Sequence, residues 1–203
     1  MIPLNEPIKI MLDNVLDMVS GALSWIGGGS NFEGQDLSGK DFSGVDLSMS
    51  NFRNVNFAGA KLAGTNLSKC NLEGVNFENA DLAGADLSYS NLKGAKGLAS
   101  LAMPGIKLRG VNLPNLDFSG HELLAAVFRA SNLANANFSG CDLTGANFSL
   151  CNLENADFTN ADLEHADFSL SNMRNAKMDG AKMAHVKITG TNLGMKERAV
   201  PVA

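Results

Sequence analysis

A large apolar residue recurs at every fifth position from Phe32 to Leu92, and the pattern resumes at Met103 and runs to Leu193. We call this residue the centre of each repeat. The residue two positions earlier is usually small, and the one directly before the centre is usually Asn or Asp. A period of five fits neither an α-helix, with about 3.6 residues per turn, nor a strand, with about two. The pattern therefore predicts a chain that turns a corner every five residues, with one large and one small side chain pointing inward.

A second, longer period indicates how many sides each coil has. The residue before every fourth centre is always Asn, namely Asn31, Asn51, Asn71, Asn91, Asn112, Asn132, Asn152, Asn172 and Asn192. We therefore expect four sides and twenty residues per coil. The step from Asn91 to Asn112 is one residue longer, which predicts a one-residue bulge near residues 96–103. Residues 30–194 would then form about eight stacked coils, a rod roughly 40 Å long at roughly 4.8 Å per coil.

The sequence ADFTNADLEH at residues 156–165 resembles the A(D/N)LxX motif of the pentapeptide-repeat family. The likeness extends over about residues 30–194. It implies an all-β fold, the right-handed quadrilateral parallel β-helix of that family. It implies little about function, because one solenoid scaffold hosts many roles.

Residues 1–29 and 195–203 lie outside the repeat. In the first segment apolar residues follow helical spacing, namely Ile8, Met11, Leu12, Val15, Val19, Ala22, Leu23 and Ile26. Pro7 suits a first helical turn and Gly27 to Gly29 a helix end. We predict an N-terminal amphipathic α-helix that either caps the first coil or docks onto a partner. Its acidic polar face argues against a membrane surface, and residues 195–203 form a short C-terminal tail.

Composition excludes several classes of function. The net charge of -5 argues against direct nucleic-acid binding. Cys70, Cys141 and Cys151 occupy small inward positions without CxxC spacing, so we expect no disulfide, no metal site and a reducing compartment. Neither a secretory signal nor a membrane span is evident, and the expected location is the cytoplasm. His121 also occupies a small inward position, which predicts a local bulge that turns it outward.

Two surface features are candidate binding sites for a protein partner. Residues 111–171 carry eight acidic side chains and only Arg129 as a base. Carboxylates align at the coil period in three columns: Glu122, Asp142 and Asp162 in one, Asp117 and Asp157 in the next, and Asp167 in a third. Ordered carboxylates can imitate DNA phosphates, although Asp also suits turns. The second feature is an outer corner where Leu150 and Leu170 should be neighbours, because exposed apolar residues in register can mark a partner site.

The sequence contains no nucleophile and base at catalytic spacing, so we expect neither an enzyme nor a cofactor. The family resemblance implies a non-catalytic binding protein, since members that protect or inhibit DNA gyrase are acidic rods. A DNA mimic that binds DNA gyrase or another topoisomerase is therefore one hypothesis. The N-terminal helix, the basic stretches and the lack of a long C-terminal helix depart from those members.

The alternative is a scaffold or a secreted bacterial effector that binds a host or cellular protein through the N-terminal helix or a face of the rod. The segments at residues 108–113 and 117–120 are similar to repeats of enterobacterial injected effectors. A homodimer is compatible with either hypothesis.

Overall fold

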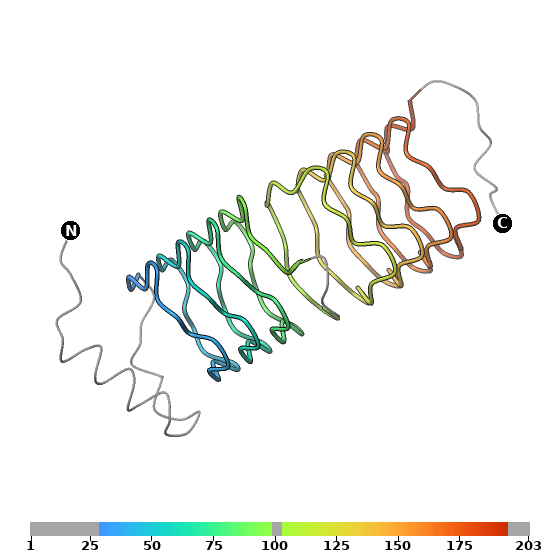
Figure 1. Ribbon diagram of the computed structural model, residues 1–203. Helices are drawn as coiled ribbons and strands as arrows, with labels where there is room; N and C mark the ends of the chain where they lie inside the picture. The colour runs from blue at the N-terminus through green and yellow to red at the C-terminus, as the bar shows by residue number, and fades with distance from the viewer. Residues whose placement is uncertain (1–28, 99–102, 195–203) are drawn as a thin grey trace, which may run out of the picture. The chain divides into compact units, whose positions relative to one another are not determined.

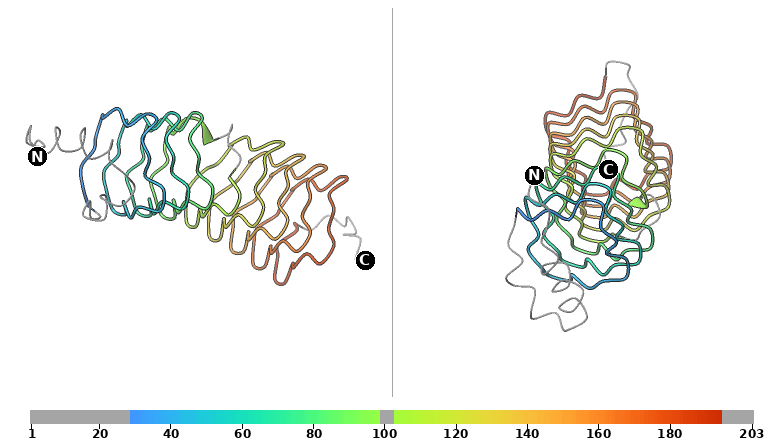
Figure 2. Two further views of the ribbon diagram at one scale, coloured as in Figure 1. Left: turned by 90° about the horizontal axis from the view of Figure 1, so that it is seen from below. Right: turned by 60° about the vertical axis from the view of Figure 1, so that its left-hand side comes forward.

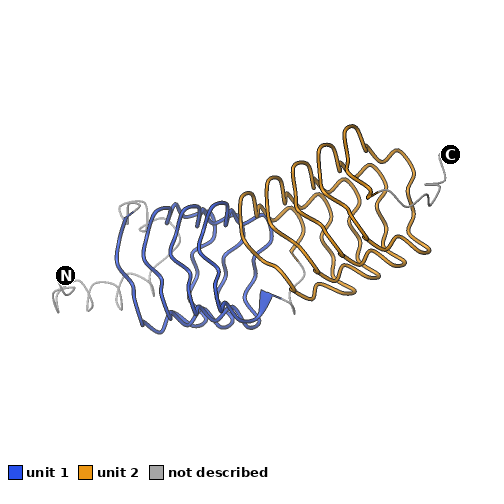
Figure 3. Ribbon diagram, turned by 90° about the horizontal axis from the view of Figure 1, so that it is seen from above, with its two compact units in different colours: residues 1–101 blue, residues 102–203 orange. Residues whose placement is uncertain are grey.

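The computed structural model describes residues 29–98 and 103–194. Within these ranges the chain forms stacked coils (Figures 1 and 2). The described residues contain no α-helix and no strand longer than a single bridging residue, because the corners interrupt pairing at every fifth position. Pairing consists of isolated parallel bridges, and each bridge joins residues twenty positions apart. The chain divides into two compact units, Met1–Leu101 and Ala102–Ala203 (Figure 3).

In unit 1 the bridges form four ladders, one for each side of the coil. We number the sides in chain order from the Asn ladder. The first side has Asn31, Asn51, Asn71 and Asn91; the second has Asp36, Asn56, Asn76 and Lys96; the third has Asp41, Lys61 and Asp81; the fourth has Asp46, Asn66 and Asp86. The bridging residue is the one directly before each centre, as the repeat predicts.

Unit 2 has the same four ladders. The first side has Asn112, Asn132, Asn152, Asn172 and Asn192; the second has Asp117, Asn137, Asp157 and Lys177; the third has Glu122, Asp142, Asp162 and Lys182; the fourth has Lys107, Val127, Asn147, Asp167 and Lys187. Bridging residues end in 1 or 6 up to Lys96 and in 2 or 7 from Lys107. This shift by one agrees with the long step in the Asn period. The bulge was predicted near residues 96–103, and residues 99–102 of that segment lie outside the described residues.

Each five-residue segment makes two kinds of backbone hydrogen bond. Across coils, the Leu62 amide donates to the Asp81 carbonyl at 2.8 Å, and the Asp81 amide donates to the Ala60 carbonyl at 2.9 Å. Within a coil, the Ala60 amide donates to the Phe57 carbonyl at 2.9 Å and closes a four-residue turn. The pattern repeats around the coils, which satisfies buried backbone groups without continuous strands.

The core is a set of columns in which like side chains stack. All centre residues from Phe32 to Leu92 and from Met103 to Met173 are buried. Phe138 stacks on Phe158 with ring centroids 5.1 Å apart, and Phe148 on Phe168 at 5.0 Å. Phe138 meets Phe148 of the neighbouring column edge to face at 5.3 Å, one of the arrangements that aromatic rings prefer. The coil interior is therefore filled by side chains.

The five-residue pattern breaks at Gly97, where the next centre would fall. A Cβ atom there would lie 2.5 Å from the Glu78 amide nitrogen, so only glycine fits against that backbone. The next residue, Leu98, is buried instead. The interruption of the repeat between Leu92 and Met103 thus begins where the backbone of Gly97 lies close to that of Glu78.

Two predictions concern segments outside the described residues, namely the amphipathic helix within residues 1–29, of which only Gly29 is described, and the tail at residues 195–203. One prediction is wrong. No bulge turns His121 outward, because its amide closes a regular turn onto the Phe118 carbonyl at 3.1 Å and Glu122 pairs with Asp142 in the ladder. The imidazole folds back instead, and its Nδ1 lies 2.8 Å from the Phe118 carbonyl oxygen.

Candidate interaction surfaces

Each corner holds one residue in the left-handed region of backbone space. A turn with a positive φ at its third residue favours Gly or Asn, because other side chains crowd the following carbonyl there. In unit 1 the corner before the first side is different. Its residues Met49, Lys69 and Tyr89 have φ values of 59–60°, whereas the other positive φ values among described residues of unit 1 belong to Gly or Asn.

The same corner of unit 2 carries the predicted pair of leucines. Leu150 and Leu170 have φ values of 61° and 60° and are 43% and 62% exposed. Ala130 precedes them at φ 60°, and Gly190 follows. A Cβ atom added at Gly190 would lie 2.7 Å from Leu170 Cδ2, so the Leu170 side chain leans towards the next coil. We call Ala130, Leu150 and Leu170 the apolar corner.

The predicted acidic residues do not share one face. Asp117 and Asp157 lie on the second side, Glu122, Asp142 and Asp162 on the third, and Asp167 on the fourth. Asn137 separates the two carboxylates of the second side. Only the third side places carboxylates on consecutive coils, so it is the strongest candidate for a row of phosphate-like charges.

Lysines one coil further on compensate part of this charge. Lys177 Nζ lies 2.8 Å from Asp157 Oδ2, and Lys182 Nζ lies 2.7 Å from Asp162 Oδ2. The hydrogen bond from Lys177, followed by that from Thr159, lowers the pKa of Asp157 to about 2. Lys182 likewise lowers the pKa of Asp162. The acidic columns of the second and third sides therefore end in ion pairs. On the third side, the carboxylates outside such a pair are Glu122 and Asp142.

In most of the aspartates one carboxylate oxygen, Oδ1, accepts a hydrogen bond from the backbone amide two residues later. Asp142 Oδ1 accepts the Thr144 amide at 3.0 Å, and Asp117 Oδ1 accepts the Ser119 amide at 2.9 Å. These are Asx turns, in which the side chain caps its own corner. Asp is thus common at this position for a structural reason, and only the outer oxygen is available to a partner.

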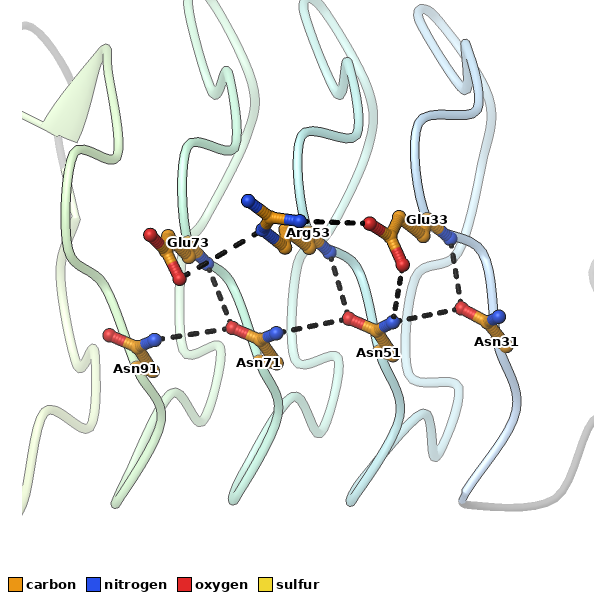
Figure 4. Close-up of polar contacts among 7 residues, drawn as sticks. All are labelled: Asn31, Glu33, Asn51, Arg53, Asn71, Glu73 and Asn91. Atoms are coloured by element: carbon orange, nitrogen blue, oxygen red, sulfur yellow. Dashed lines mark hydrogen bonds and ion pairs between the residues drawn. The ribbon is translucent and has the colours of Figure 1, made fainter. Parts of the chain in front are cut away.

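The first side of unit 1 combines an amide ladder with alternating charges (Figure 4). Asn51 Nδ2 donates to Asn31 Oδ1 at 3.0 Å, and Asn71 and Asn91 continue the series at 3.1 and 3.2 Å. Beside this ladder lie Glu33, Arg53, Glu73 and Lys93, which we call the alternating strip.

Arg53 joins its two acidic neighbours in the strip. Its Nη1 lies 3.2 Å from Glu33 Oε1, and its Nε lies 4.0 Å from Glu73 Oε2. The sequence-based interpretation missed this strip because net charge was summed over blocks. The strip is nevertheless visible in the sequence, because the side-chain charge changes sign at every twentieth residue from Glu33 to Lys93.

The three cysteines are buried, as their inward positions predict. Burial raises the pKa of Cys70 and of Cys141 to about 11 and that of Cys151 to about 12. Each thiol donates to a backbone carbonyl, such as Cys151 to Phe128 at 2.9 Å. Because a thiolate is the reactive form, these residues act as small core side chains.

His165 and His185 stand at successive corners with their rings stacked 4.9 Å apart. No cluster of three or more His, Cys, Asp or Glu side chains suited to a metal ion occurs in residues 29–98 and 103–194. In these same ranges no helix is long and apolar enough to cross a membrane. The features that distinguish the described surface are thus its charged columns and its corners.

Comparison with known sequences gives one family for both units. The profile described as pentapeptide repeats matches residues 28–64 and 60–96, and that described as a pentapeptide repeat region matches residues 111–194. No curated protein matches the chain.

Among solved structures, a trypsin-treated variant of QnrB1, a plasmid-mediated fluoroquinolone resistance protein, is 23% identical with a TM-score of 0.52. That match covers 82% of this chain and 92% of QnrB1. HetL from Nostoc sp. strain PCC 7120, which is involved in the regulation of heterocyst differentiation, is 22% identical over 93% of this chain and 96% of its own, with a TM-score of 0.32. QnrB1 is a right-handed β-helix, the fold that the repeat predicts.

Proposed function

Because the chain belongs to the pentapeptide-repeat family, whose members are structural and interaction modules, we propose that it is a non-catalytic module that binds a protein partner through the apolar corner of unit 2. The location of the protein is inferred from its sequence alone, and we propose the cytoplasm.

One observation carries this proposal, the left-handed backbone at two exposed leucines. An L-residue in this conformation costs about 1–2 kcal/mol, a cost that Gly at the same place avoids. Gly occupies both ends of this corner in unit 2, at Gly110 and Gly190, so glycine is compatible with it. Leu150 and Leu170 nevertheless stand there and remain largely exposed. Strain that brings little burial is typical of a functional surface, and the apolar side chains suit an apolar patch on a protein.

The test is retention of partner proteins from an extract of the source cells by the wild-type chain and by Leu150→Glu/Leu170→Glu. The control is Asn155→Glu/Asn175→Glu, which adds the same charges at the next corner of the same two coils, also with positive φ. Because this control removes the hydrogen bonds from Asn155 to Asn135 and from Asn175 to Asn155, circular dichroism first checks that both variants fold. We expect the leucine variant to lose a bound protein that the control retains. If both variants retain the same proteins as the wild type, the apolar corner is not the binding site.

A second candidate function is binding of DNA gyrase by DNA mimicry. It is supported by Glu122 and Asp142 on consecutive coils of the third side, and by a net charge of -7 over residues 111–171, from eight acids and one base. The likeness to a fluoroquinolone resistance protein is a likeness of fold. The ion pairs of Asp157 and Asp162 weaken this candidate relative to the apolar corner.

Purified gyrase tests the second candidate directly. Supercoiling with and without a fluoroquinolone would be measured in the presence of the wild-type chain, Glu122→Lys/Asp142→Lys, and the control Asp36→Lys/Asp46→Lys, which makes the same charge change in unit 1. DNA mimicry predicts an effect of the wild type and the control that the first variant lacks. A wild-type chain without effect at micromolar concentration would rule the mimic out and favour a scaffold or a secreted effector with another partner.

A further inference from the structure

The alternating strip of unit 1 has a sign pattern that changes to its opposite when the order of the coils is reversed. Read along the first side, Glu33, Arg53, Glu73 and Lys93 are negative, positive, negative and positive. Figure 4 shows Glu33, Arg53 and Glu73 projecting from successive coils of one side. Arg53 and Glu33 are 48% and 41% exposed in their side chains, so the charges are accessible.

We propose that this side binds a second copy of the chain, face to face and with the coil stacks antiparallel. A two-fold axis between the second and third coils of unit 1 places Glu33 opposite Lys93 of the other copy, and Arg53 opposite Glu73. All four facing pairs then have opposite charges. Such self-complementarity is what an isologous contact requires, because each residue meets its partner twice.

The spacing of the charges favours a second copy over another kind of partner. Ladder-paired coils repeat at about 4.8 Å, the separation of neighbouring strands. A helix repeats at about 5.4 Å per turn, and one face of a strand at about 6.6 Å, so charges on either would lose register with the strip within a few coils. A second ladder of the same period stays in register over all four charges.

The edges of this side fit the same arrangement. At the corner before it, the two-fold axis brings Tyr89, 50% exposed, opposite Gly29, where the absence of a side chain leaves room for the ring. Met49, 61% exposed, comes opposite Lys69, whose alkyl chain can cover it. The corner after the strip has only Gly and Asn, namely Gly34, Asn54, Gly74 and Gly94, so the strips can approach closely.

The size of the surface determines how strong the contact is. Four coils of one side offer less than the ~800 Å² per partner of a standard stable interface. The expected assembly is therefore a transient dimer that depends on concentration and weakens with salt. It is independent of the partner proposed for unit 2.

A complete inversion of the strip separates this proposal from a merely structural role. The variant Glu33→Lys/Arg53→Glu/Glu73→Lys/Lys93→Glu keeps opposite charges next to one another within the chain, so it should fold as the wild type does. It also remains complementary to itself. Against a wild-type chain, however, it places like charges opposite one another at all four positions.

Sedimentation equilibrium of each protein alone, and energy transfer between differently labelled N-termini in mixtures, measure the association. We expect wild type and inverted variant each to dimerise, and their mixed dimer to be at least about tenfold weaker, because facing like charges repel. The pair Glu33→Lys/Glu73→Lys and Arg53→Glu/Lys93→Glu gives a second readout, since each alone should be monomeric and their mixture should associate. Mixed dimers as strong as the homodimers, or a wild-type chain that stays monomeric up to about 1 mM, would overturn the proposal.

Discussion

Leu170 has the most informative backbone, because its left-handed conformation is unfavourable for a residue with a side chain. Replacement by Gly removes the left-handed strain and an exposed side chain. We expect Leu170→Gly to leave the free energy of unfolding unchanged or to raise it by up to about 1 kcal/mol, while partner retention falls. Denaturant unfolding and the retention assay would be run on the same preparation.

The matched control for this prediction is Ala130→Gly at the same corner, which relieves similar strain without removing a large apolar side chain. Its stability should change as in Leu170→Gly, and its binding should not. A loss of stability in Leu170→Gly would mean that the leucine stabilises the fold, and would contradict the proposal that this corner is a binding site.

At the same scale, the ion pair of Asp157 and Lys177 predicts a pH dependence. The pKa of Asp157 is lowered to about 2 in the folded chain, against about 3.9 for an unperturbed Asp. The carboxylate therefore contributes stability in full above about pH 4, and this contribution is lost as the pH falls from about 4 to about 2. Its size should be below about 1 kcal/mol, since the lysine is largely exposed.

Carbon-13 NMR of the Asp157 carboxyl group measures this pKa in the wild type and in Lys177→Met. Removal of the ammonium should raise the pKa towards its ordinary value, and Asp157→Asn should flatten the loss of stability in acid. An unchanged pKa in Lys177→Met would show that the turn hydrogen bonds alone stabilise the carboxylate.

The inward residues could be read from sequence, whereas the corners could not. The position of Cys151 follows from the period, because a five-residue repeat fixes which residues face the core, and the thiol is buried as expected. The positive φ of Leu150 leaves no mark in a hydrophobic pattern, since it depends on the turn that each corner adopts. The sequence thus located the apolar corner but not the strain that makes it a strong candidate. The prediction of a bulge at His121 was wrong for a related reason. A side chain that folds back onto its own turn fits a small inward position without a bulge.

At the scale of the ladder, the Asn columns are the element whose role the structure explains best. Asn152 donates to Asn132 Oδ1 at 3.0 Å and accepts from Asn172 Nδ2 at 3.0 Å, while its Oδ1 also accepts the Glu154 amide at 3.3 Å. An identical side chain is required at every level, because each amide is both donor and acceptor. This explains why one residue type marks every fourth repeat and why the twenty-residue coil could be predicted from it.

We expect Asn152→Ala to lower the free energy of unfolding by about 1–2 kcal/mol, because it removes the side-chain hydrogen bonds to both adjacent coils and the one from the Glu154 amide. Asn192→Ala is the control, since in the described residues its amide bonds the ladder only through Asn172. Its effect should be about half as large in denaturant unfolding. Equal losses at the two positions would show that the ladder bonds contribute little beyond each turn.

At the scale of the whole molecule, the net charge of a stretch could be counted from the sequence, but the side of the coil on which each charge lies could not. The block over residues 111–171 has a net charge of -7 by count, yet the ladders distribute its carboxylates over different sides. The alternating strip is the opposite case, because its two acidic and two basic side chains have no net charge but form an ordered pattern along one side. Summation along the chain cannot separate sides that only the fold defines.

Salt dependence distinguishes the two surfaces of unit 2, because charge attraction is screened and apolar contact is not. The Debye length falls from about 10 Å at 0.1 M salt to about 3 Å at 1 M. If the apolar corner carries binding, the affinity for the retained protein should change less than about threefold between 0.1 and 1 M NaCl, and Leu170→Gly should weaken it at every salt concentration. Isothermal titration calorimetry of the wild type, Leu170→Gly and Glu122→Lys/Asp142→Lys supplies the comparison. A steep loss of affinity with salt, together with sensitivity to the charge-reversed variant alone, would assign binding to the third side and make DNA mimicry the better account of the molecule.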